Sequence, residues 1–244
     1  MIASLGMYDM PPIRPCNDRF WRAIRARLGR GPECLTWDRD LWTIWRAPDL
    51  VLAQTCGMPY RTALHGEVAL VGTPDYGLPD CPPGHYRSVF VSRKATGDRT
   101  LADLANGVFA YNDALSQSGW AAPMHHLAAR DLRPARLVAT GSHAGSARAV
   151  ATGRADLAAL DALTWALLQE HDPVAAELAE IGATDPTPGL PYITALGQDT
   201  GAIAAAITGA IDDLDPADRA ALHLKRLVAI PAEAYLAIAT PPGP

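Results

Sequence analysis

Short apolar runs alternate with longer segments of helical periodicity along this chain. The short runs are bounded by Gly, Pro and polar residues, which is typical of strands, whereas apolar residues recurring every three or four positions indicate helices. The expected strands are Ile2–Met7, Leu50–Ala53, Val68–Thr73, Ser88–Arg93, Val108–Tyr111, Leu137–Thr140, Leu157–Leu160 and Pro191–Ala195. The expected helices are Asp18–Leu28, Trp120–Ala129, Ala144–Thr152, Ala162–Glu170, Ala202–Leu214, Pro216–Leu227 and Pro231–Ala239, and Ala175–Gly182 is mixed.

This alternation predicts an α/β fold with mostly parallel sheets. In such sheets ligands bind at the carboxyl ends of the strands. Three loops at such ends carry unusual polar residues: Gln54 to Gly57, Asn112 to Gly119, and Gly141 to Ser146. These loops are therefore the first places to look for a site.

The loop from Asn112 to Gly119 is the most informative of the three. It joins an expected buried strand to an expected helix and carries Ser116, Ser118 and Gly119. Backbone N–H groups and small hydroxyls at a helix N-terminus suit an anion. Neither a Walker lysine nor a G-x-G-x-x-G motif is present, so a nucleoside triphosphate or a dinucleotide is not implied. The alternative interpretation is an ordinary helix cap.

Composition narrows the class of protein. The 244 residues are 49% hydrophobic and 19% charged, which is enough for a sizeable core in one large domain or two small ones. The net charge of −5 argues against a nucleic-acid partner. The arginines between Arg19 and Arg30 have the spacing of a solvated helix face opposite Phe20, Ile24 and Leu28.

No apolar run reaches the roughly 18 residues of a membrane span, so membrane insertion is not expected. Met1 to Met10 lacks the features of a signal peptide. The protein is therefore expected to be cytoplasmic, or periplasmic if an export signal lies outside this chain. The four cysteines form no C-x-x-C pair, so neither a zinc site nor any other metal site is expected, although export would permit a Cys56–Cys81 bridge.

Six motifs in a fixed order carry a family resemblance. They are Q-T-C-G-M-P (54–59), T-P-x-Y (73–76), Y-R-S-V-F-V-S-R (86–93), N-x-x-x-S-Q-S-G-W (112–120), T-G-S-H-x-x-S-x-x-A-V-A-x-G-x-A-D-x-A-A-L-D (140–161) and T-P-G-L-P-Y-I-T (187–194). Together they resemble the PhnD-like phosphate, phosphite and phosphonate substrate-binding proteins of ABC transporters. The resemblance covers about residues 1 to 240.

This resemblance implies a type II periplasmic-binding-protein fold, in which two Rossmann-like α/β lobes are joined by a two-strand hinge. Lobe one would comprise residues 1–90 and 196–244, and lobe two residues 91–195. The hinge strands would be Ser88–Arg93 and Pro191–Ala195, and the ligand would lie in a cleft between the lobes.

The resemblance also implies the ligand-binding residues. Ser116, Gln117 and Ser118 match the position that holds the ligand's anionic oxygens, and His143 matches a histidine used at the anion, although it could instead be a helix-start or core residue. Asp161 lies near the position of an acid for a ligand amine, but it could equally cap the following helix. The full expected set is Tyr8, Thr55, Cys56, Asn112, Ser116, Gln117, Ser118, Gly119, His143 and Asp161.

Thr55 and Cys56 depart from the aromatic residue that aminophosphonate-binding members tend to have, so a phosphonate ligand is not assured by the resemblance. Cys56 could be a small wall residue, half of a bridge with Cys81, or a thiolate activated at a helix N-terminus.

Three functions follow from these residues. The first is a non-catalytic, monomeric solute-binding protein that takes a small anionic or zwitterionic ligand, needs no cofactor and works with an ABC permease. The second is an enzyme on the same fold, with Cys56 as nucleophile, His143 as base and Asp161 orienting it. The third is a cytoplasmic ligand-sensing module.

Overall fold

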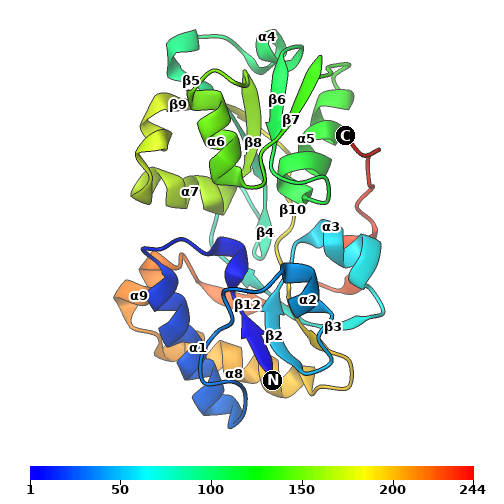
Figure 1. Cartoon of the computed structure of the whole chain (residues 1–244). Helices are drawn as coiled ribbons and strands as arrows, with labels where there is room; N and C mark the ends of the chain where they lie inside the picture. Colours follow the sequence, from blue (N-terminus) through cyan, green and yellow to red (C-terminus); the bar gives the residue numbers. More distant parts are fainter. The chain divides into compact units, whose positions relative to one another are not determined.

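The computed structural model describes all 244 residues, and the chain folds as two compact units (Figure 1). Unit 1 contains Met1–His85 and Pro188–Ile238, and unit 2 contains Tyr86–Thr187 and Ala239–Pro244. The chain therefore passes between the units three times. Two of these passages coincide with β4 (His85–Tyr86) and β10 (Thr187–Pro188), which pair as a two-stranded sheet.

Unit 1 is built on a five-stranded sheet in the order β1-β2-β11-β3-β12. Its strands are β1 (Ile2–Ser4), β2 (Leu50–Gln54), β3 (Val68–Asp75), β11 (Tyr192–Ala195) and β12 (Arg226–Val228). Strands β1 and β2 are parallel, whereas β11 is antiparallel to both β2 and β3, and β12 is antiparallel to β3.

Helices cover this sheet, and α1 packs against α8. The helices and helical turns of unit 1 are η1 (Gly6–Tyr8), α1 (Arg14–Leu28), α2 (Leu41–Trp45), α3 (Gly57–Pro59), η2 (Tyr60–Leu64), α8 (Thr200–Asp213), α9 (Pro216–Ala221) and α10 (Ala232–Leu236). The core includes Ile44, Leu50, Leu64 and Ile193, all almost fully buried. Burying an aliphatic side chain of this size contributes about 1.5–3 kcal/mol.

Unit 2 has a second five-stranded sheet, in the order β7-β6-β8-β5-β9. Its strands are β5 (Ser88–Arg93), β6 (Val108–Tyr111), β7 (Arg136–Ala139), β8 (Leu157–Asp161) and β9 (Leu178–Ala183). Its helices and turns are η3 (Lys94–Thr96), α4 (Leu101–Ala105), η4 (Gln117–Ala121), α5 (Ala122–Ala128), α6 (His143–Ala151), α7 (Ala162–His171) and η5 (Pro173–Glu177).

The sense of the strands in unit 2 matters for the site. Strand β6 is parallel to both of its neighbours, β7 and β8. Strand β5 is antiparallel to β8 and to β9. Because β6, β7 and β8 run in the same direction, their carboxyl ends share one edge of the sheet. The core of this unit contains Phe90, Phe109, Leu127 and Leu157.

The α/β class is confirmed, but the expectation of mostly parallel sheets is wrong. Only β1–β2, β6–β7 and β6–β8 are parallel pairs; the other pairs in the two large sheets are antiparallel. Each antiparallel pair involves β5, β11 or β12. Strands β5 and β11 follow passages of the chain between units, so no helix of their own sheet sets their direction. The strands expected to form the hinge lie within unit 2 (β5) and unit 1 (β11).

Several element boundaries also differ from the sequence prediction. Helix α1 begins at Arg14, not at Asp18, because Pro15 is tolerated in the first helical turn. The expected helix over Pro216–Leu227 ends at Ala221 and is followed by β12. The first strand ends at Ser4 and is followed by the η1 turn.

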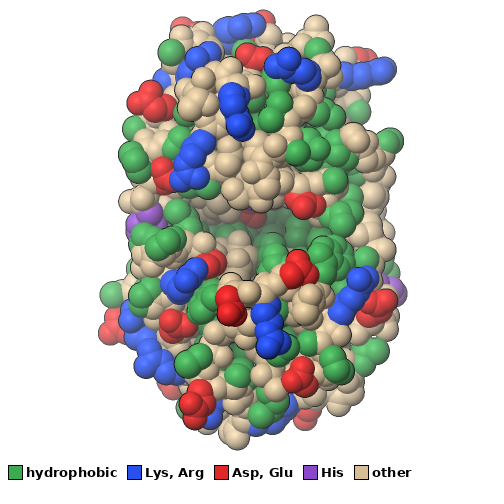
Figure 2. Space-filling model, in the orientation of Figure 1, with side chains coloured by type: hydrophobic (Ala, Val, Ile, Leu, Met, Phe, Trp, Pro, Cys, Tyr) green, Lys and Arg blue, Asp and Glu red, His purple; other side chains and the backbone are tan.

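The arginine-rich face of α1 is not simply solvated. Arg19 donates from Nε to Asp218 Oδ2 at 2.6 Å, and Arg27 pairs with Asp213. The bond from Arg19 lowers the pKa of Asp218. These arginines therefore connect α1 to the helices of the C-terminal part of unit 1. On the face shown in Figure 2, positive and negative side chains are interspersed over unit 1.

None of the helices combines the length and the apolar character needed to cross a membrane.

Candidate anion-binding site

Two polar loops of unit 2 follow β6 and β7 at the shared edge of the sheet, where β8 passes directly into α7 at Asp161. Backbone hydrogen bonds join the two loops. Thr140 N donates to Tyr111 O at 2.9 Å, and Gly141 N donates to Asn112 O at 3.0 Å. The loop after β6 and the loop after β7 are therefore held side by side.

The loop after β6 leads into a π-helical turn, η4, that continues as α5. Ser116 caps this turn, because its Oγ accepts a hydrogen bond from Gly119 N at 2.9 Å. Ser116, Gln117 and Ser118 are all buried. The first N–H groups of a helix have no acceptor within the helix, and π-helical turns are frequent at functional sites.

His143 is the first residue of α6, directly after the cap residue Ser142, whose Oγ accepts from Gly145 N at 3.0 Å. Its Nε2 lies 2.9 Å from Ser118 Oγ, within hydrogen-bond distance. Two residues that are 25 positions apart in the sequence thus meet because β6 and β7 are neighbours. The beginnings of two helical segments converge at this pair.

The imidazole of His143 is held in its neutral form. Burial lowers the pKa of His143 to about 4, and the nearby backbone of Ala159 opposes this shift only partly. The Nδ1 atom of the ring is buried without a hydrogen-bond partner. With a neutral ring, Ser118 and His143 form a pair of uncharged groups. Such groups can bind an anion without supplying a counter-charge.

Asn112 explains why a glycine follows Ser118. The Oδ1 atom of Asn112 is buried without a hydrogen-bond partner and lies against Gly119. A Cβ atom on Gly119 would lie 1.7 Å from Asn112 Oδ1 and 3.3 Å from His143 Cε1. Only glycine permits this close approach.

Hydroxyl groups that the sequence did not single out complete the loop after β7. Thr140 Oγ1 donates to Tyr111 O at 2.9 Å and lies 2.7 Å from Ser146 Oγ. Both residues belong to the T-G-S-H-x-x-S motif, which was the signal available in the sequence. These bonds brace the start of α6, where His143 lies.

Asp161, the last residue of β8, caps helix α7. Its Oδ1 accepts hydrogen bonds from Leu163 N at 2.8 Å and from Thr164 N at 3.0 Å. The capping role, which was the alternative interpretation of Asp161, is therefore present in the structure.

Replacing Asp161 with alanine is expected to lower the free energy of unfolding by about 1–2 kcal/mol, because two backbone N–H groups lose their acceptor. Asp161→Asn keeps an oxygen at the cap and is expected to remain near the stability of the unmodified protein. Urea denaturation of both variants checks this. Equal destabilisation by Asn and Ala would show that the negative charge, and not the cap, is what this position requires.

The remaining expected residues lie in unit 1. Tyr8, in η1, is buried and makes an edge-to-face contact with Tyr76, with ring centroids 5.4 Å apart. Gln54 donates to Tyr76 Oη at 3.0 Å. Tyr76 was not among the expected site residues, although the T-P-x-Y motif contains it.

Thr55 and Cys56 follow β2 at the start of the α3–η2 helical segment. Thr55 is fully buried, and its Oγ1 has no hydrogen-bond partner. Cys56 is buried and makes no side-chain cap bond. None of the four cysteines forms a disulfide, so the Cys56–Cys81 bridge is absent.

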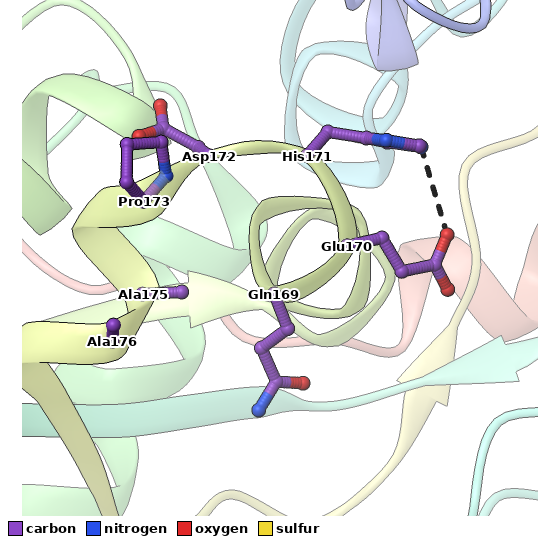
Figure 3. Close-up of a pocket in the computed structure, with 7 residues that line it drawn as sticks. All are labelled: Gln169, Glu170, His171, Asp172, Pro173, Ala175 and Ala176. Carbon is purple, nitrogen blue, oxygen red and sulfur yellow. Dashed lines mark ion pairs between the residues drawn. The ribbon is translucent and has the colours of Figure 1, made fainter.

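A separate pocket of about 460 Å³ lies at the other end of α7 (Figure 3). It is lined by Gln169, Glu170, His171, Asp172, Pro173, Ala175 and Ala176. Figure 3 shows His171 and Glu170 paired, at 3.6 Å. The lining contains none of the expected ligand-binding residues. No group of three or more His, Cys, Asp or Glu side chains in the structure is placed to hold a metal ion.

Comparison with known proteins identifies a family. Residues 49–234 match the family described as "ABC transporter, phosphonate, periplasmic substrate-binding protein". None of the curated proteins matches the chain.

Several solved structures share the fold. PhnD1 from Prochlorococcus marinus, in complex with methylphosphonate, superposes with a TM-score of 0.74 at 17% identity over 96% of this chain and 93% of PhnD1. A binding component of an ABC phosphonate transporter from Pseudomonas aeruginosa gives 0.69 at 17% identity, over 94% and 81%. A chloride-bound protein from Xanthomonas citri gives 0.68 at 16% identity, over 96% and 92%.

These likenesses show a type II periplasmic-binding-protein fold. The family match covers more than half of the chain, from the start of β2 to α10. The chain belongs to the periplasmic substrate-binding proteins of phosphonate ABC transporters.

Proposed function

We propose that this protein binds a small phosphorus oxyanion, such as phosphate, phosphite or an alkylphosphonate, and presents it to an ABC permease without changing it chemically. The observation that carries the proposal is the Ser118–His143 pair, 2.9 Å apart where two helical segments begin. PhnD1, which shares the fold, was solved with methylphosphonate.

Neutral donors suit this task. An anion that leaves water needs hydrogen bonds to replace those it loses, and bonds to a charged acceptor are stronger than neutral ones. Ser118 is only 3% exposed, so a ligand that it binds is largely removed from water. The neutral His143 leaves the net charge of the bound oxyanion unchanged, which favours reversible release.

Tyr8, Thr55 and Cys56 of unit 1 are proposed as further ligand-binding residues. The support is the buried hydroxyl of Thr55, which has no hydrogen-bond partner within the protein. For Gln117 and Asn112 the support is their place in the loop after β6. Asp161 would act through α7, which it caps.

The Ser118→Ala, His143→Ala double variant is expected to lose the thermal stabilisation that methylphosphonate or inorganic phosphate gives the unmodified protein. At a ligand concentration of 100 times Kd, that stabilisation would be about 2.7 kcal/mol. Differential scanning fluorimetry with each anion measures it.

A matched control is the Thr152→Ala, His171→Ala double variant, which makes the same types of change in unit 2 at the far ends of α6 and α7. It is expected to keep the full thermal shift. An unchanged shift in the Ser118 and His143 variant would place the ligand elsewhere.

The enzyme hypothesis receives no support from these contacts. His143 Nε2 is engaged with Ser118, and Asp161 Oδ1 accepts from the backbone of α7. Cys56 is buried. We therefore expect iodoacetamide to label Cys56 slowly at neutral pH. Rapid stoichiometric labelling would instead support the enzyme hypothesis.

A ligand-sensing module would share the site and differ only in its partner.

A further inference from the structure

The last residues of the chain belong to a different unit from the helix that precedes them. Helix α10 (Ala232–Leu236) is part of unit 1, whereas Ala239–Pro244 is part of unit 2. In Figure 1 this terminal segment, drawn in red, ends beside α5. It forms the third passage of the chain between the units.

Two side chains of unit 2 hold this segment by its backbone. Trp120 donates from Nε1 to Pro242 O at 3.1 Å, and His125 lies with Nε2 3.0 Å from Ala239 O, to which it donates. Trp120 is buried and also contacts the ring of Tyr111, with centroids 5.3 Å apart. Both contacts span more than 110 positions of sequence, so they are tertiary contacts and not local ones.

The residues that hold the segment lie in the helical segment that begins at the site. Trp120 follows Gly119 directly and lies within η4, the turn that begins with Gln117 and Ser118. His125 lies in α5, which continues that turn. The position of the segment is therefore tied to the turn that carries the proposed anion-binding groups.

The other end of the segment is tied to unit 1. Tyr235, in α10, is almost fully buried and donates from Oη to Gly189 O at 3.0 Å. The Tyr235 hydroxyl oxygen also lies 2.6 Å from Thr73 Oγ1 on β3. Only four residue steps separate Tyr235 from Ala239, a length that spans at most about 14 Å.

We propose that Leu236–Pro242 is a strap that tethers unit 1 to the anion-binding turn of unit 2 and steadies that turn. Only Leu236, Ala237 and Ile238 lie between the two anchored ends, so the tether is short. Pro241 and Pro242 restrict the backbone between the two anchored carbonyls in unit 2. The inference does not depend on the identity of the ligand.

Hydrogen exchange of the ligand-free protein tests the strap. A chain that lacks Ala239–Pro244 and the full-length Trp120→Phe, His125→Ala variant are both expected to exchange the backbone amides of η4 and α5 about 25-fold faster. Both variants lose the two hydrogen bonds to the segment, and each net bond lost corresponds to about fivefold. Mass spectrometry of peptides that cover residues 112–128 measures this. The full-length variant decides the matter if the shortened chain does not fold.

Trp165→Phe is the matched control, since Trp165 also donates its indole N–H within unit 2, to Glu180 Oε1 at 2.5 Å. It is expected to leave exchange in residues 112–128 unchanged. Unchanged exchange in residues 112–128 in both strap variants would overturn the proposal, as would faster exchange confined to the terminal segment.

Discussion

Replacing Gly119 with alanine is expected to abolish oxyanion binding and to lower the free energy of unfolding by about 1–3 kcal/mol, the usual cost of overpacking. The added Cβ would overlap Asn112 Oδ1, at 1.7 Å, and crowd His143. Relieving that overlap requires the loop after β6 to move away from α6, which separates Ser118 from His143. Urea denaturation and calorimetric titration with methylphosphonate measure the two effects.

The same change at Gly201 is the control. Gly201 lies in the first turn of α8, where an added Cβ would have only an ordinary contact, 3.4 Å from Asp199 Oδ1. Gly201→Ala is expected to leave binding unchanged and to stabilise the helix slightly. The Asn112→Ala, Gly119→Ala double variant removes the overlapping oxygen and is expected to regain stability. If Gly119→Ala alone is as stable as the unmodified protein and binds normally, the described packing of Asn112 is wrong.

Lowering the pH from 7 to 4 is expected to cost the folded protein about 3 kcal/mol through His143 alone, given a pKa near 6.5 in the unfolded chain. The pKa of His143 is about 4 in the folded protein because the ring is buried. Between these two values the unfolded chain binds more protons than the folded one, so stability is present at pH 7 and is lost as the pH falls toward 4.

Comparison with His143→Gln isolates this contribution from that of the other titrating groups. Glutamine retains a hydrogen-bonding side chain near Ser118 but does not titrate. The difference in free energy of unfolding between the two proteins is expected to shrink steadily as the pH falls below 6.5. A difference that stays constant from pH 7 to pH 4 would mean that His143 is exposed enough to protonate in the folded state.

Much of the fold can be predicted from the sequence because strand signals are local. The β-branched run Ser88–Arg93 and the apolar run Val108–Tyr111 form β5 and β6 with the expected bounds. The direction of a strand, however, depends on where the chain comes from. Nothing within the sequence of β5 indicates that it follows a passage from unit 1 and runs antiparallel to β8.

The helix predicted over Pro216–Leu227 is too long, since α9 ends at Ala221 and β12 follows it. Apolar residues continue beyond the end of the helix, at Leu222, Leu224 and Leu227. The backbone leaves the helix near His223, which has a φ of 52°, a left-handed conformation that glycine usually adopts. A histidine at that position gives no stop signal, so β12 was not predicted.

The candidate site could be predicted in part. The serines of S-Q-S-G and the histidine of T-G-S-H belong to separate sequence motifs. The structure brings Ser118 and His143 together. The contact of Asn112 with Gly119 could not be anticipated, because it depends on the exact turn of the loop. The contacts of Trp120 and His125 with the end of the chain had no sequence signal either.

The most direct test of oxyanion binding at Ser118 and His143 is an NMR titration of ¹⁵N-labelled protein with methylphosphonate, phosphate, phosphite and sulfate. At least one of the phosphorus oxyanions is expected to change the chemical shifts of the Ser118 and Gly119 backbone amides and of the His143 ring. These changes are expected to saturate together as the concentration of the anion rises. That response should be absent from the Ser118→Ala, His143→Ala variant. Saturable binding with shifts confined to other residues, or no response to any phosphorus oxyanion, would contradict it.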